Sequence, residues 1–170
     1  MELCTEEEVA RLLQLVNQQR RKEALKYRHT FGQWACLKSW MMLKELGIEG
    51  EWQYNEYGKP YIPGGPEFSI SHCKHGIAVA VDERPIGIDI ESIRKADEAL
   101  VERTMNEAER EQIHSDADFI RLWTQKEAYL KNVGTGIVND LHHVLDKTEG
   151  VTMKTTITEK YIYTICYETR

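Results

Sequence analysis

The sequence lacks a long hydrophobic run: its longest apolar stretch, residues 76–81, is far shorter than the roughly 20 residues that a membrane-spanning helix needs. Its first eight residues are mostly acidic and polar, whereas a secretory signal peptide begins with basic residues and continues with an apolar segment. We therefore expect neither membrane insertion nor export, and we predict a cytoplasmic protein.

Cysteine is scarce and scattered along the chain. The four cysteines are Cys4, Cys36, Cys73 and Cys166, and none of them forms a Cys-x-x-Cys pair, which argues against a structural zinc site. Because no export is expected, we predict reduced thiols and not a pair of disulfides.

Positive charge is also in short supply. The chain has 22 Lys and Arg residues against 28 Asp and Glu residues, a net charge of −6, which gives no overall attraction to nucleic acid or to an anionic membrane. Basic residues do gather between Arg20 and Arg28. Such a run usually forms a solvated helix face, and an anion-binding surface is the alternative.

What the chain does have is enough apolar sequence for a core, with 41% hydrophobic and 29% charged residues over 170 positions. Periodicity and turn residues predict helices near 5–16, 31–46, 97–104, 107–113 and 116–132. They predict strands near 52–54, 67–71, 76–82 and 86–91, and a hairpin over 151–167 that turns at Glu159 and Lys160. This order predicts an α+β fold with two similar halves of about 85 residues each.

Two acidic residues mark the strand expected over 86–91. Alternate side chains share one face of a strand, so Asp89 and Glu91 point the same way while Ile88 and Ile90 face the core. Two hard oxygen ligands suit Mg²⁺, which one or two carboxylates hold together with phosphate oxygens and water. A solvated strand end that carries two surface acids explains the pattern equally well.

A third carboxylate interrupts the apolar stripe of the helix expected over 116–132. Glu127 falls on the same side as Trp123 and Leu130, where an unpaired charge costs several kcal/mol. A local pair with Lys131, four residues on, gains only about 0.2–0.5 kcal/mol. A metal or a substrate phosphate explains the placement better.

Two further candidates have strong structural alternatives. Ser71 and His72 end a strand and with nearby amides suit a phosphate, but adjacent strand residues face opposite ways and make a poor nucleophile and base. Glu109 fits a capping box with Asn106, so its acid needs no catalytic explanation.

Together these segments resemble the 4′-phosphopantetheinyl transferase superfamily over about residues 58–137. The four motifs stand in the family's order, as Gly58-Lys59-Pro60, Phe68-Ser69-Ile70-Ser71-His72, Gly87-Ile88-Asp89-Ile90-Glu91, and the helix segment from Trp123 to Lys131 with Lys126-Glu127-Ala128 inside it. The Asp-x-Glu form resembles the longer class, which has two pseudo-symmetric halves in one chain. That class implies small antiparallel sheets packed with helices, halves of about 1–85 and 86–170, and a monomer.

The resemblance implies an enzyme of the holo-[acyl-carrier-protein] synthase type. Such an enzyme moves the 4′-phosphopantetheine arm of coenzyme A onto a serine of an acyl or peptidyl carrier protein and releases adenosine 3′,5′-bisphosphate. Coenzyme A, Mg²⁺ and the carrier protein are then the expected substrate, cofactor and partner, with no nucleic acid or membrane involved.

The sequence departs from the family's pattern at two positions. Cys73 replaces a serine that is common after Ser-His, and Thr135 stands where relatives often have a lysine between two glycines.

The family's functional residues carry over by position. The resemblance implies that Asp89, Glu91 and Glu127 hold Mg²⁺, and that Lys131 contacts phosphate. It assigns coenzyme A binding to Lys59, Ser71, His72 and either Arg21 or Arg28. Glu109 matches an acid implicated in catalysis, and the proton of the carrier serine is taken by Glu127, Glu109 or a metal-bound water.

Two other functions stay open on the sequence alone. A Mg²⁺-dependent phosphodiesterase or nuclease would use the same three carboxylates, but the chain shows no interleaving of aromatic and basic residues along a nucleic acid path. A non-catalytic module that binds coenzyme A or a carrier protein would have no reason to keep three mutually repelling acids.

Overall fold

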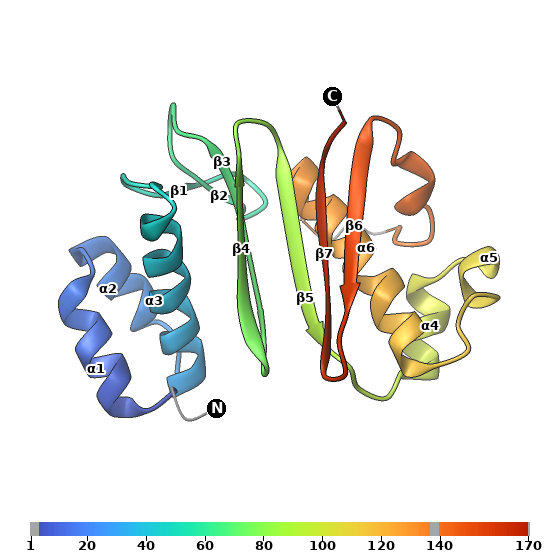
Figure 1. Ribbon diagram of the computed structural model, residues 1–170, viewed down its shortest axis with the longest axis horizontal. Coiled ribbons are helices and arrows are strands. Elements are labelled where there is room, and N and C mark those ends of the chain that lie inside the picture. Colours follow the sequence, from blue (N-terminus) through green and yellow to red (C-terminus); the bar gives the residue numbers. More distant parts are fainter. Residues whose placement is uncertain (1–3, 137–139, 170) are drawn as a thin grey trace. The chain divides into compact units, whose positions relative to one another are not determined.

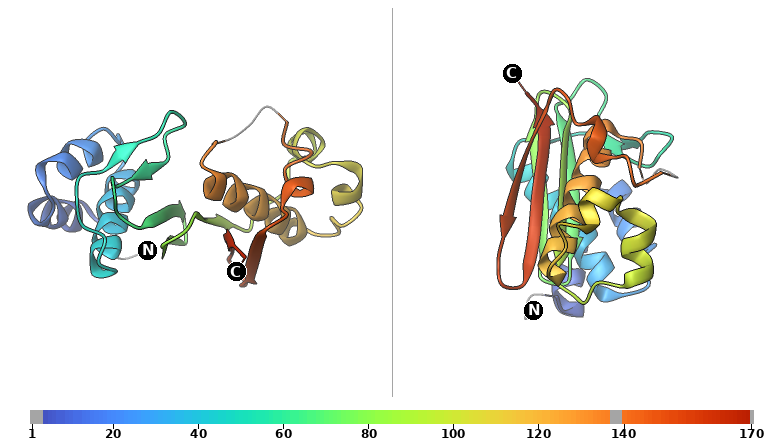
Figure 2. Two further views of the ribbon diagram at one scale, coloured as in Figure 1. Left: turned by 90° about the horizontal axis from the view of Figure 1, so that it is seen from above. Right: turned by 90° about the vertical axis from the view of Figure 1, so that its right-hand side faces the viewer.

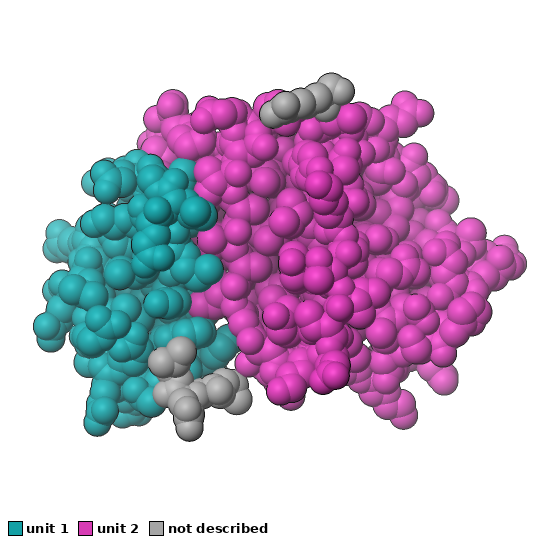
Figure 3. All heavy atoms as spheres, in the orientation of Figure 1, with its two compact units in different colours: residues 1–51 teal, residues 52–170 magenta. Residues whose placement is uncertain are grey.

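The computed structural model describes residues 4–136 and 140–169, so residues 1–3 and Ile137, the end of the expected family match, lie outside the described residues. The chain divides into two compact units, residues 1–51 and residues 52–170 (Figure 3). We describe each unit by itself. The expected similarity between halves that meet near residue 85 stays a prediction.

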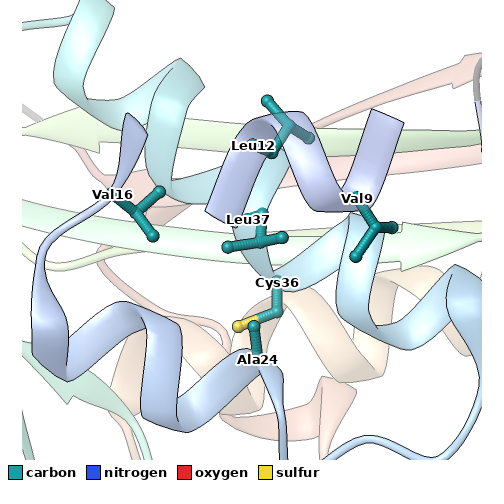
Figure 4. Packing of buried hydrophobic residues seen from close by; sticks show 6 residues of the cluster. All are labelled: Val9, Leu12, Val16, Ala24, Cys36 and Leu37. Carbon is teal, nitrogen blue, oxygen red and sulfur yellow. The ribbon is translucent and has the colours of Figure 1, made fainter. Parts of the chain in front are cut away.

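Unit 1 consists of three helices, α1 (Glu6–Leu15), α2 (Gln18–Ala24) and α3 (Thr30–Glu45). The Thr5 hydroxyl accepts a hydrogen bond from the Glu8 amide at 3.1 Å, so Thr5 caps α1. Small and branched apolar side chains from all three helices and from Val16 form the core (Figure 4); they are Val9, Leu12, Val16, Ala24, Cys36 and Leu37.

The basic run of unit 1 is not a uniform solvated face. Arg20 lies on α2, is buried, and donates a hydrogen bond to the Cys36 sulfur at 3.3 Å. Arg21 and Arg28 are exposed, and Arg21 Nε donates to the Leu13 carbonyl near the end of α1 at 2.9 Å. The run therefore divides between a core contact and a solvated surface.

Unit 2 contains all seven strands of the described residues, and every pairing among them is antiparallel. Short strands β1 (Gln53–Tyr54) and β2 (Pro60–Tyr61) pair, as do β3 (Glu67–Cys73) and β4 (Gly76–Asp82). The third sheet has the order β5-β7-β6, with β5 (Ile86–Ser92), β6 (Val151–Ile157) and β7 (Tyr161–Glu168). These small antiparallel sheets with helices confirm the predicted α+β class and the C-terminal hairpin.

The helices of unit 2 lie on one side of the β5-β7-β6 sheet (Figures 1 and 2). They are α4 (Glu98–Thr104), α5 (Glu107–Arg110) and the long α6 (Asp116–Val133), and a 3₁₀ turn at Leu145–Lys147, which the sequence did not predict, follows. Met105, Phe119, Ile120, Leu122 and Ile162 form the core where α6 meets β7. Helix α6 also packs directly on β5, the strand that carries the acidic motif.

Serine hydroxyls connect β3 with β5. Ser69 Oγ accepts a hydrogen bond from the Ile88 amide at 3.0 Å, and Ser71 Oγ accepts one from the Ile90 amide at 3.2 Å. These bonds satisfy buried amides of β5 on the edge opposite β7, and they bring the end of β3 beside Asp89.

All four cysteines are free thiols. None of the helices within residues 4–136 and 140–169 combines the length and the apolar character that crossing a membrane requires.

Candidate functional site

The site is built around Asp89, in the middle of β5. Its side chain is buried, with 3% of the residue exposed, so a solvated strand end does not describe it. Oδ1 of Asp89 accepts hydrogen bonds from Ser71 Oγ at 2.8 Å and from Lys131 Nζ at 2.7 Å. Oδ2 is also buried and has no hydrogen-bond partner in the described structure. One carboxylate oxygen is thus held by two hydrogen bonds, and the other is buried without a partner in the described structure.

A glycine lets α6 approach this strand closely. A Cβ atom at Gly87 would overlap the Ala128 carbonyl of α6, so only glycine fits between the strand and the helix. One turn further along, Asn132 Nδ2 donates to the carbonyls of Pro85 at 2.6 Å and Cys166 at 3.3 Å. These contacts set the helix against β5 so that Glu127 and Lys131 lie near Asp89.

Lys131 forms its ion pair across the fold and not along its own helix. The expected alternative was a local pair between Glu127 and Lys131, but the 2.7 Å contact of Lys131 Nζ is with Asp89, 42 residues away. Glu127 Oε1 is buried and without a hydrogen-bond partner in the described structure. Among the described residues Glu127 forms no salt bridge, since the amine of Lys131 pairs with Asp89.

Mutual repulsion and burial raise the pKa values of the two other acids. Burial, followed by the negative charge of Asp89, raises the pKa of Glu127 to about 7, although the charge of Lys131 opposes the shift. Burial and Asp89 also raise the pKa of Glu91, with partial relief from Arg94, the Trp123 indole and Lys131. Three carboxylates thus lie near two cations, Lys131 and Arg94, which still leaves an excess of negative charge.

These acids fit a divalent cation whose coordination a substrate completes. Within residues 4–136 and 140–169, no three His, Cys, Asp or Glu side chains converge closely enough to form a ready metal site. Mg²⁺, however, is commonly held by one or two carboxylates with substrate phosphates and water. Among the buried oxygens without a partner in the described structure, Asp89 Oδ2 and Glu127 Oε1 belong to this cluster and match that demand for hard and incompletely satisfied ligands, whereas Glu109 Oε1 lies in a separate cluster.

A cavity of about 270 Å³ opens beside Glu127 and Lys131. The turn between β1 and β2 forms one wall, with Lys59 in it, and β3 forms another. Glu127, Lys131 and the glycines after α6 form the third. The cavity brings together three residues that the sequence singled out, although Lys59 Nζ also pairs with Glu67 at 3.0 Å.

Ser71 and His72 lie at the end of β3 and differ in their surroundings. The Ser71 hydroxyl is buried and bonds to Asp89 and to the Ile90 amide. The His72 side chain is exposed to solvent, yet packing around its ring and the charge of Lys131 lower its pKa, and Asp89 partly opposes this. Ser71 therefore supports Asp89, and His72 lies within electrostatic range of the same cluster.

Glu109 belongs to a second, buried cluster. It closes the predicted capping box, since Asn106 Oδ1 accepts from the Glu109 amide and Glu109 Oε2 accepts from the Asn106 amide, both at 2.9 Å. The same Oε2 accepts from Lys126 Nζ at 2.7 Å, and Lys126 also donates to the carbonyls of Thr104 and Leu141. This geometry favours a structural role, and the catalytic role stays an untested prediction.

The sequence did not indicate a role for Lys126, Gly87 or Asn132, although the first two lie within the motifs that resemble the family. A lysine on the core side of α6 was the available signal for Lys126, since a buried lysine requires a partner. Arg21 and Arg28 belong to unit 1, whereas all the site residues described above belong to unit 2. Coenzyme A binding by either arginine stays a prediction.

Comparison with known proteins shows which family the chain resembles. Residues 85–169 match the family model of the 4′-phosphopantetheinyl transferase superfamily. The 4′-phosphopantetheinyl transferase gsp of Aneurinibacillus migulanus is 34% identical over 120 residues, which are 65% of this chain and 50% of the relative. A 4′-phosphopantetheinyl transferase of Bacillus subtilis is 40% identical over 90 residues, 48% of this chain and 40% of the relative. A third, ffp of Bacillus subtilis, is 30% identical over 150 residues, 78% of this chain and 66% of the relative.

The α+β fold agrees with this match, and the chain belongs to the 4′-phosphopantetheinyl transferase superfamily. The matched regions span from two fifths to two thirds of the lengths of these relatives. The resemblance that the four motifs indicated is confirmed.

Proposed function

We propose that this chain transfers the 4′-phosphopantetheine group of coenzyme A to a serine of an acyl or peptidyl carrier protein, in a Mg²⁺-dependent reaction that releases adenosine 3′,5′-bisphosphate. Membership of the superfamily supports the reaction class. The observation that carries the proposal is the surplus of carboxylates around Lys131 at the edge of a cavity, with two buried oxygens unpartnered. Such a surplus destabilises a protein unless a cation binds there, and the bound cation can then attract an anionic substrate.

Each acid has a distinct part in this proposal. Asp89, Glu91 and Glu127 would hold Mg²⁺, which supplies positive charge against the pyrophosphate of coenzyme A. Ser71 orients Asp89 through the 2.8 Å hydrogen bond and leaves Oδ2 available. Lys131, whose side chain is 29% exposed, keeps a charged amine beside the acids for phosphate oxygens.

Proton transfer from the carrier serine is assigned to Glu127. Without metal, burial and the charge of Asp89 raise its pKa to about 7, so both its protonated and its deprotonated form are populated near neutral pH. Mg²⁺ held by the same carboxylate would lower this pKa and keep Glu127 deprotonated, ready to accept the serine proton. Glu109 is the weaker candidate, because its Oε2 already accepts from Lys126 and from the Asn106 amide.

The test is incubation of the chain with coenzyme A, Mg²⁺ and an apo carrier protein, read by intact-protein mass spectrometry. We expect the carrier to gain the phosphopantetheine mass, and we expect chelation by EDTA to stop the gain. Cleavage of nucleic acid or of a phosphodiester without carrier modification would favour a phosphodiesterase. Binding of coenzyme A without turnover would favour the non-catalytic module.

The finer assignments belong to the same proposal. We expect a cytoplasmic protein. We also expect a monomer, because Lys59, Asp89 and Glu127 all lie in one unit of one chain; a trimer in sedimentation would contradict the monomer.

Lys59→Ala or His72→Ala should raise the KM for coenzyme A more than it lowers turnover. Parallel assays with fatty acid and peptide synthase carriers decide whether specificity is of the holo-[acyl-carrier-protein] synthase type.

A further inference from the structure

The turn that carries Lys59 is organised by one side chain, Asn55. Its Oδ1 accepts hydrogen bonds from the amides of Tyr57 at 3.0 Å and Lys59 at 2.9 Å. The backbone adds bonds from the Asn55 amide to the Lys59 carbonyl and from the Gly58 amide to the Asn55 carbonyl, both 3.0 Å. Asn55 therefore sets the path of the chain from Tyr57 to Lys59.

The same side chain fastens this turn to the end of α6. Asn55 Nδ2 donates to the Gly134 carbonyl at 2.8 Å, across 79 residues of sequence. Gly134 ends the helix with φ 81°, and a Cβ atom there would lie 3.3 Å from the Lys59 side chain and 3.4 Å from Asn55 Nδ2. The turn and the helix end are thus packed tightly around one half-buried amide.

The cavity beside Glu127 lies between the two parts that Asn55 joins. Tyr57 and Lys59 line it from the turn, Gly134 lines it from the helix end, and Asn55 bonds to all three. The side-chain amide of Asn55 donates through its nitrogen and accepts through its oxygen. No other residue type of this size can form all three of these hydrogen bonds.

We propose that Asn55 is a positioning residue for coenzyme A: it holds Lys59 at the distance from α6 that the substrate requires. This inference rests on the proposed function, because coenzyme A is the ligand that it assigns to the cavity. Asn55 acts through Lys59 on substrate affinity, and it takes no part in the chemical step.

The test uses neutral variants, because an added charge beside Lys59 would itself repel coenzyme A. Asn55→Ser keeps a weaker acceptor for the turn and loses the reach to Gly134, whereas Asn55→Ala loses both. Tyr61→Phe is the matched control: it removes the hydrogen bond from the Tyr61 hydroxyl to Gln53, at 2.8 Å on the same hairpin. Calorimetry with coenzyme A and Mg²⁺ but no carrier gives Kd, and the transfer assay gives KM and kcat.

We expect Asn55→Ser and Asn55→Ala to raise the Kd and KM for coenzyme A about tenfold, which corresponds to one hydrogen bond. Turnover at saturating coenzyme A should change less than about twofold, and Tyr61→Phe should match the unchanged chain. In a Lys59→Met background the Asn55 substitutions should have little further effect on the Kd for coenzyme A, because the lysine through which Asn55 acts is already absent.

Four outcomes would overturn the inference. Unchanged Kd with a lowered melting temperature would make Asn55 a purely structural residue. Equal effects with and without Lys59 would show that it does not act through that lysine. If Asn55→Ala folds poorly, Asn55→Ser carries the test. Failure of the unchanged chain to bind coenzyme A would overturn the proposed function as well, whereas unaltered binding and transfer by both variants would overturn this inference alone.

Discussion

Two lysines on α6 meet carboxylates from distant parts of unit 2, and the two clusters are built in opposite ways. Lys126 has a fully buried side chain and faces one carboxylate, Glu109, together with two carbonyls, so charge is balanced. Lys131 is partly exposed and faces Asp89 with Glu127 and Glu91 close by, so negative charge is in excess.

The difference shows how one helix separates support from function. A balanced and sealed ion pair resists change, because removal of either partner leaves an uncompensated buried charge. An unbalanced cluster at the edge of a cavity lowers the stability of the folded protein, and binding of a ligand with the opposite charge restores that stability. Substitutions in the first cluster should therefore affect folding, and substitutions in the second should affect activity.

The largest expected effect is on activity, at Glu127. Glu127→Gln keeps the size of the side chain and removes its charge, so transfer should fall by about two to three powers of ten while the chain stays folded. Rates of carrier modification and thermal melts of the metal-free protein measure both effects. The control is Glu159→Gln, at the exposed turn between β6 and β7. Near-normal transfer by Glu127→Gln would show that the cluster of acids around Lys131 is not needed for activity.

The second expected effect is on folding, at Lys126. Lys126→Met leaves Glu109 buried without its partner and should lower the free energy of unfolding by about 3–5 kcal/mol. Adding Glu109→Gln should recover part of the loss. Urea denaturation measures this, with Lys26→Met in the exposed pair with Glu23 as a control that changes stability little. A folded, stable Lys126→Met protein that has lost transfer would instead give Lys126 a functional role.

The third prediction concerns pH, in protein kept free of divalent metal. The folded pKa of Glu127, about 7, exceeds its ordinary value of 4.5, so between these pH values the unfolded carboxyl has lost its proton while the folded one keeps it. Stability should therefore fall as pH rises from about 4.5 to about 7, by up to about 3 kcal/mol from this group. Below that window the penalty is absent.

Glu127→Gln isolates this contribution from other titrating groups. The variant should show a flatter dependence of unfolding free energy on pH and should be the more stable protein above pH 7. Parallel pH profiles for the two proteins would mean that the acids around Lys131 do not repel one another as the structure indicates.

The smallest expected effect comes from the spacing between α6 and β5. Gly87→Ala should cost about 1–3 kcal/mol, because the added methyl group forces the helix away from the strand. The contact of Lys131 with Asp89 should loosen with it, which lowers transfer. Gly76→Ala is the control, since its Cβ would meet Ile90 only at an ordinary 3.7 Å. Equal stability of the two variants in urea would show that α6 is not held at that distance.

Local pattern was enough to predict most of the elements. The strands over 76–82 and 86–91 and the helix over 116–132 match β4, β5 and α6 to within about one residue, because alternation, helical periodicity and glycine ends are local properties. The pattern did not predict α2, β2 or the 3₁₀ turn at Leu145–Lys147, because elements this short carry little periodic signal. The motif order was also sufficient to indicate the family.

The sequence by itself determined which residue types are available for the site: three acids, Lys131 and the Gly58-Lys59-Pro60 turn, in that family's order. Only the tertiary structure decided how they pair. Lys131 lies four residues from Glu127 yet bonds to Asp89, because the close approach at Gly87 brings the helix to the strand. Asn55 gains its role in the same way, since its partner Gly134 is 79 residues distant. Contacts across such separations depend on packing, which no local pattern specifies.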